Sequence, residues 1–243
     1  MTDRVMVQMA DQTGMKALHM VTSGDPARNA SFVFFGDPNY FLTDFPASTC
    51  KTCINPLFAW NHGDIQPEIA TTWIGMVGPG VSHLGQTGRT WSDHADVRPT
   101  VLTLLGLKDT YVHDGRALVE VIQEYARPAR LREAEGLLSE FADLFKQINA
   151  PFGSLALDSL KVSTAALSSN APADSVYTVL QAKIAGWTAR RDGLAGDMKA
   201  LLDGATFHGR PFDGRRALQL TAEARALLTE VRRCAAHVSS CAK

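Results

Sequence analysis

The sequence predicts an α/β portion over residues 1–126 followed by an all-helical bundle over residues 127–243. Two observations support this division. Short runs of strand-forming residues bounded by glycine and proline lie in the first part, at residues 31–35 and 71–77. Beyond Arg116, apolar residues recur almost throughout at helical spacing. The boundary is expected near Arg127 and Pro128, where the helical stripe breaks.

Each element of the first part follows from a local pattern. Residues 5–9 form a short strand candidate, and residues 31–35 form a compact apolar one that a Gly-Asp-Pro-Asn turn closes. Residues 71–77 are rich in strand formers and predict a buried strand that a Gly-Pro-Gly turn ends. A helix is then expected from a cap at Asp93 or Asp96 to a stop at Gly106, with an apolar stripe of Val97, Val101, Leu104 and Leu105.

The second part contains long amphipathic segments. Residues 117–125 and 131–148 form one apolar stripe interrupted at Pro128. Residues 174–204, with Asp174 as the N-cap, form the next segment, and residues 215–238 the last. Because the connections between them are rich in glycine, proline and serine, these segments predict an antiparallel helical bundle.

Two further features concern the surface and continuity of these helices. Glycines inside the second long segment each cost about 1 kcal/mol relative to alanine and argue against an unbroken rod: Gly186, Gly193 and Gly196. The arginine pairs at 190–191, 215–216 and 232–233 are expected to lie on solvated helix faces.

Composition and charge exclude several classes of protein. With 243 residues, of which 45% are apolar, the chain is long enough for a buried core. Residues 1–126 carry eight Lys/Arg and thirteen Asp/Glu, a net charge of −5, whereas residues 127–243 carry sixteen and twelve, a net charge of +4. So diffuse a positive charge disfavours nucleic acid as a partner. Neither a membrane span nor a signal peptide is expected, and the cellular location stays open.

The four cysteines fall into two close pairs, Cys50 with Cys53 and Cys234 with Cys241. A disulfide between Cys50 and Cys53 would close a very small loop, contribute only about 2 kcal/mol and hold the loop before His62. Such a bond would indicate an exported parent protein. A zinc site assembled from both pairs and a thiol-redox role for the first pair are weaker alternatives.

The central part of the chain carries an ordered series of motifs. His62-Gly63-Asp64 is followed by residues 71–77, by Gly78-Pro79-Gly80, by the Asp96-Val-Arg-Pro-Thr helix and by Asp114-Gly-Arg. Over about residues 58–118 this order resembles the closing segment of the alkaline phosphatase superfamily, which includes nucleotide pyrophosphatase/phosphodiesterases and sulfatases. The resemblance implies an incomplete alkaline phosphatase-like sheet with flanking helices over residues 1–126.

The resemblance also implies roles for individual residues. His62 would be a late ligand of a divalent metal such as zinc, and Asp64 would orient its imidazole or its loop. Asp93 and His94 resemble part of a Ser-Asp-His-Gly metal motif, although alanine replaces its glycine and helix capping is the better interpretation of Asp93. Arg116 would bind a substrate anion.

The family's nucleophile segment and its other metal-ligand motifs are not found before His62. We therefore expect the C-terminal part of a metal-dependent phosphoesterase, acting on a small phosphate ester in the parent enzyme and inactive alone. Metal binding by this chain alone is expected to be weak or absent. The alternative is a non-catalytic interaction module that binds a protein partner through its helical bundle. Exposed apolar surface would favour this alternative. If the sheet is incomplete, part of the edge of residues 71–77, or the face that covers it, should be left unpaired.

Overall fold

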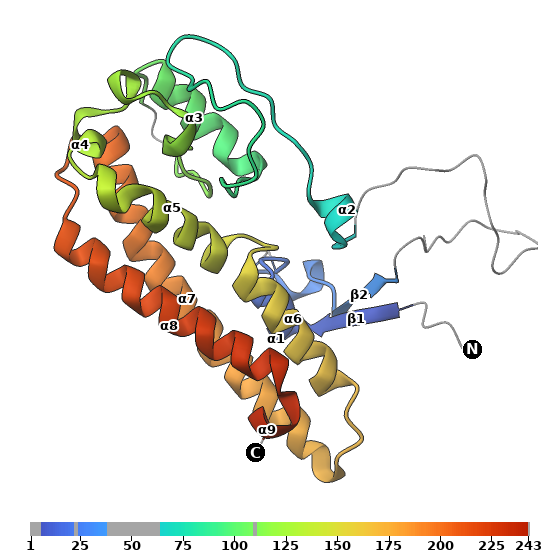
Figure 1. Ribbon diagram of the computed structural model, residues 1–243. Coiled ribbons are helices and arrows are strands. Elements are labelled where there is room, and N and C mark those ends of the chain that lie inside the picture. Colours follow the sequence, from blue (N-terminus) through green and yellow to red (C-terminus); the bar gives the residue numbers. More distant parts are fainter. Residues whose placement is uncertain (1–5, 22–23, 38–63, 109–110, 243) are drawn as a thin grey trace, which may run out of the picture.

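The computed structural model describes residues 6–21, 24–37, 64–108 and 111–242. Long helices dominate it, with a small sheet on one side and a less regular segment that contains α2 and α3 lying outside the long helices (Figure 1). No helix in the described ranges is long and apolar enough to cross a membrane.

The prediction of an alkaline phosphatase-like α/β sheet is wrong. In the described part of the chain the sheet has two strands, β1 (Met6–Asp11) and β2 (Phe32–Gly36), which pair antiparallel. Residues 71–77 do not form the predicted buried strand, because no described strand lies beside them and most of their side chains are exposed. Strand propensity is realised only when a neighbouring strand and a packing surface are present.

The strand pair itself confirms the predicted strands near residues 5–9 and 31–35. Ala10 and Phe35 are buried against the helix α6 (Ser154–Leu167), whereas Phe32 and Phe34 on the other face are exposed. At Met9, the backbone N–H donates to the Thr164 hydroxyl at 3.0 Å, and that hydroxyl also bonds the Met9 carbonyl. Helix α6 therefore covers one face of the ribbon and part of its β1 edge.

The helical bundle is confirmed. Helices α5 (Glu135–Asn149), α6, α7 (Ser175–Phe207) and α8 (Gly214–Ala236) pack around a shared core (Figure 1). Helix α7 is unbroken despite its glycines, because bundle packing supplies more stability than local propensity removes. Most apolar positions of the predicted stripes are buried, including Leu138, Phe141, Phe145, Ile148, Leu180, Ile184, Trp187, Leu220, Leu227 and Val231.

Helix α6 is absent from the sequence-based prediction. It is the central helix and contacts β1, α1, α5, α7 and α8, so it is buried on several sides and lacks a clear polar face. A tight corner leads into it: a Cβ on Gly153 would lie 2.6 Å from the Lys146 carbonyl oxygen. Only glycine permits the chain to turn this closely after α5.

Shorter elements complete the fold: α1 (Gln12–Ala17), α2 (Pro67–Ala70), α3 (Val97–Leu104), α4 (Ala129–Arg132) and α9 (Val238–Cys241). The prediction of a helix over residues 117–125 is wrong. Two single-turn 3-10 helices, Val119–Val121 and Glu124–Ala126, replace it, and Ile122 between them forms a bridge with Val81. A disulfide joins Cys234 and Cys241 at the end of the bundle.

One arginine departs from the predicted solvated faces. Arg191 on α7 is buried, and its guanidinium donates to the carbonyls of Lys16 and Ala17, both at 3.2 Å. It also contacts His19 Nε2 at 2.7 Å and Asp192 at 2.6 Å. Because the last carbonyls of a helix lack partners within that helix, Arg191 caps α1 and ties it to the bundle.

Candidate functional site

The segment that carries the predicted site residues is attached to the bundle by a buried group of charges, which we call the Lys146 cluster: Asp93, Asp96, Arg116, Glu120 and Lys146. The Lys146 ammonium, on α5, lies 2.8 Å from Asp93 Oδ2 and 3.0 Å from Asp96 Oδ1. Asp96 is fully buried and Lys146 almost so. The Lys146 ammonium lies between the two carboxylates, so neither the buried Lys146 nor the buried Asp96 lacks an oppositely charged partner.

Local sequence explains why the two aspartates lie together. The Asp93 carboxylate caps the 3-10 turn His94–Asp96 by accepting from the Ala95 N–H at 3.0 Å. Asp96 returns the interaction by accepting from the Asp93 N–H at 3.0 Å. This reciprocal capping confirms the predicted helix start and aims both carboxylates at α5.

Arg116 lies in the same cluster. Its guanidinium is fully buried and forms two bonds of 2.7 Å with the Glu120 carboxylate, while its backbone N–H donates to Asp96 Oδ1 at 2.8 Å. A bidentate carboxylate occupies the face that would bind a substrate anion. In this arrangement Arg116 organises the segment from within instead of facing solvent.

The other predicted site residues do not converge. His62, Cys50 and Cys53 lie outside the described residues. Asp64 Oδ1 accepts from the Ile65 N–H at 2.7 Å, which is a local turn contact. His94 is exposed on the turn that Asp93 caps. Within residues 6–21, 24–37, 64–108 and 111–242, no group of three or more His, Cys, Asp or Glu side chains is arranged to hold a metal.

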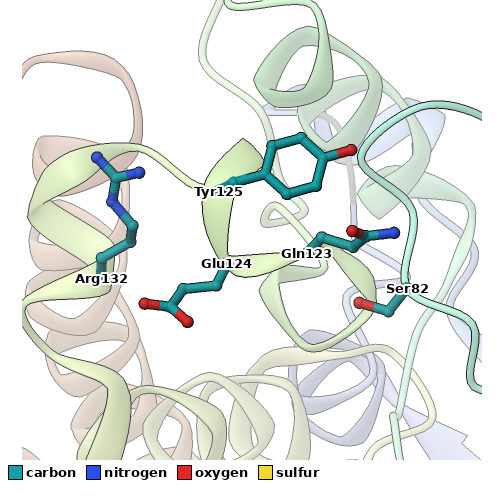
Figure 2. A pocket seen from close by; sticks show the side chains of 5 residues that line it. All are labelled: Ser82, Gln123, Glu124, Tyr125 and Arg132. Carbon is teal, nitrogen blue, oxygen red and sulfur yellow. The ribbon is translucent and has the colours of Figure 1, made fainter.

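Figure 2 shows a hollow of about 580 Å³ that sequence reasoning did not identify. Ser82, Gln123, Glu124, Tyr125 and Arg132 line it. Backbone hydrogen bonds hold two of the lining residues in place. The Ser82 N–H donates to the Val121 carbonyl at 2.8 Å, and the Gln123 N–H donates to the Gly80 carbonyl at 2.7 Å. Among these side chains, Arg132 is a cation and Glu124 an anion.

The most unusual surface belongs to α3. Val97, Val101 and the C-cap residue Leu105 are exposed, Leu105 by 64%, although the sequence places them on the stripe expected to face a core. Leu104, the fourth residue of that stripe, is half-buried. Residues spaced by four lie next to one another on a helix, so the three exposed side chains form one patch. We call it the α3 apolar face.

The inward side of α3 explains this inverted orientation. Pro99, Thr100 and Thr103 face the protein and are buried. The Thr100 hydroxyl donates to the Asp96 carbonyl at 2.6 Å and accepts from the Leu118 N–H at 2.9 Å. Gly115 approaches the start of the helix so closely that a Cβ there would lie 2.3 Å from the Ala95 carbonyl. Small and hydroxyl-bearing residues fit this close backbone approach, which leaves Val97, Val101 and Leu105 outside and Leu102 and Leu104 half-buried.

Further apolar side chains of the same segment are exposed: Trp73, Ile74, Val77, Leu84, Leu107, Tyr111 and Val112. They precede or follow α3 in the sequence and lie in the part of the chain outside the bundle (Figure 1). Exposed apolar surface on this scale is typical of a site that binds another protein.

Comparison with known proteins identifies no relative: no family model, curated protein or solved structure matches this chain.

Proposed function

We propose that the chain is the docking and closing part of a metal-dependent phosphoesterase similar to the alkaline phosphatase superfamily. In this proposal the bundle carries residues 64–118, and the α3 apolar face binds a catalytic α/β body on the same or another polypeptide. The assembled enzyme would bind a divalent metal such as zinc, with His62 as one of its ligands, and hydrolyse a small phosphate ester.

The outward orientation of Val97, Val101 and Leu105 is the observation that carries this proposal. A surface helix normally turns its apolar stripe toward the core. Helix α3 instead turns three of the four stripe residues outward, and it does so within and just after the Asp-Val-Arg-Pro-Thr motif that resembles the family. The buried Lys146 cluster holds the segment on α5, so the face is presented by a rigid support rather than by a loose loop.

The test is reconstitution. The DNA upstream of the Met1 codon would be read in every frame for a strand leading to a Thr or Ser nucleophile, and that segment would be co-expressed with this chain. We expect zinc- or manganese-dependent hydrolysis of bis-p-nitrophenyl phosphate by the assembled protein, no hydrolysis by this chain alone, and loss of activity in His62→Ala.

A matched pair of variants tests the docking surface. Leu105→Glu places a charge on the α3 apolar face and should weaken assembly at least roughly tenfold, since a buried unpaired charge is costly. Leu218→Glu makes the same change at a similarly exposed position on α8, 54% against 64%, and should leave assembly unchanged. Equal effects of the two substitutions would contradict docking through α3.

The second candidate function is a non-catalytic interaction module, which the same exposed face also favours. It predicts a complex that forms through α3 without metal-dependent hydrolysis. A metal-dependent rate from the isolated chain that disappears in His62→Ala would contradict both functions, because neither assigns catalysis to this chain alone.

A further inference from the structure

Among the described residues, the backbone of residues 72–77 has no hydrogen-bond partner. Thr71 donates to the Pro67 carbonyl at the end of α2, and Val81 donates to the Gly78 carbonyl in the following turn. Between them, no N–H or C=O of residues 72–77 forms a hydrogen bond with another described residue. Figure 1 shows this stretch as an extended connection that leaves α2 and runs beside neither strand of the sheet.

The side chains of this stretch are apolar and exposed. Trp73 is 89% exposed and Val77 99%, and Ile74 is 48% exposed. Thr, Trp, Ile and Val are strand formers. Free peptide groups with apolar side chains form a template on which another strand can pair, a liability that proteins normally cover.

We propose that residues 71–77 pair antiparallel with the same residues of a second copy of this chain. In a register centred on Ile74, the two Ile74 side chains face each other and each Trp73 lies opposite the Gly75 of the other copy. The Trp73 ring already packs beside Gly75 in a single chain, where a Cβ on that glycine would lie 3.2 Å from a ring atom. An aromatic side chain opposite a glycine is a favourable cross-strand arrangement.

Charge also favours a second copy as the occupant. Residues 69–88 contain no Asp, Glu, Lys or Arg, so two copies meet without like charges facing each other. Pro67 and Pro79 bracket the stretch and limit the pairing to a short strand. Because a two-stranded pair is only marginally stable in water, association should be weak and concentration-dependent. This inference does not depend on the proposed phosphoesterase function.

The experiment is sedimentation velocity of the purified full chain over a wide concentration range. The mass should rise from 26.3 kDa toward twice that value. Ile74→Lys places two ammonium groups opposite each other and should weaken association roughly tenfold. Leu84→Lys is the matched control, since Leu84 is equally exposed, at 48%, on the same uncharged stretch and lies outside the paired strand. It should associate as the wild type does.

The decisive experiment mixes two oppositely charged variants, Ile74→Lys and Ile74→Glu. Neither Ile74→Lys nor Ile74→Glu should associate appreciably alone, whereas an equal mixture should, because opposite charges then face each other across the pair. Hydrogen exchange should show protection of the amides of residues 72–77 in the dimer.

Three results would overturn the proposal. The first is a monomer at every concentration. The second is equal weakening by Ile74→Lys and Leu84→Lys, or weakening by Leu105→Glu alone, which would place the contact on the α3 apolar face. The third is a mixture of the two charged variants that stays monomeric.

Discussion

Replacing Lys146 with methionine should strongly destabilise the attachment of α3 to the bundle. The substitution keeps much of the side-chain volume but removes the only ammonium that the structure places within 4 Å of the Asp96 carboxylate among the described residues. Asp96 is fully buried, so its charge would lose its partner in a place that water does not reach. Breaking a buried pair in this way costs roughly 3–5 kcal/mol. The Ala95 and Arg116 amides would still hold the aspartates but could not neutralise them.

The assay is urea unfolding followed by circular dichroism, with hydrogen exchange of the α3 amides as the local measurement. Lys161→Met is the control, because Lys161 pairs with Asp158 at 2.8 Å but is 55% exposed, and such pairs contribute less than about 1 kcal/mol. Adding Asp96→Asn to Lys146→Met should recover part of the loss, since the unpaired charge is then removed. A loss for Lys146→Met no larger than that for the control would refute this account of the cluster.

The remaining predictions concern the rest of the bundle. Gly193→Ala, where a Cβ meets nothing within 4 Å, should raise the free energy of unfolding by about 1 kcal/mol, whereas Gly153→Ala should lower it in the same urea assay. Burial and a neighbouring arginine lower the pKa of His19 from 6.5, so the unfolded chain takes up the proton first and stability should fall as pH drops below 6.5. His19→Asn, which tolerates the positive φ of 55°, should remove that slope in urea unfolding at several pH values. Reducing the Cys234–Cys241 disulfide should cost about 2 kcal/mol, measured by thermal unfolding with and without dithiothreitol.

The long helices were predictable because their burial is one-sided. In α5 and α8, apolar residues recur at helical spacing with polar residues between them, and the buried positions follow that stripe closely. The start of α8 also carries a local signal, since the Asp213 carboxylate accepts from the N–H groups of Arg215 and Arg216. Helices of this kind can be predicted because their apolar spacing and their caps are visible in neighbouring residues of the sequence.

Helix α6 and the buried Arg191 were not predictable for the opposite reason. Buried residues of α6 include Asp158, Ser159 and Ser163 beside its leucines, because five elements surround it. No periodic stripe survives such burial on several sides. Arg191 is buried because its guanidinium finds carbonyl partners on α1, more than 170 positions away in the sequence. Neither feature has a local signature.

The residues of the predicted metal and substrate site differ in where the structure places them. His62 lies outside them, whereas Asp93 and Arg116, from different motifs, are brought into one buried cluster. The sequence places both residues in one series of motifs. It could not show that Lys146, a residue of the bundle, would neutralise the first, or that Glu120 would pair with the second.

Helix α3 is where the sequence pattern and the structure disagree in the most informative way. The prediction of its cap, its length and its stop was right, since Asp93 caps the preceding turn and Gly106 adopts φ 65° after the helix. The predicted direction of the apolar stripe was wrong for Val97, Val101 and Leu105, which are exposed, whereas Leu104 is half-buried. The Thr100 hydroxyl holds the inner side of α3 to the Asp96 carbonyl and the Leu118 N–H, so turning the stripe inward would break these hydrogen bonds. The exposure of Val97, Val101 and Leu105 is therefore a consequence of how the inner side of α3 is held.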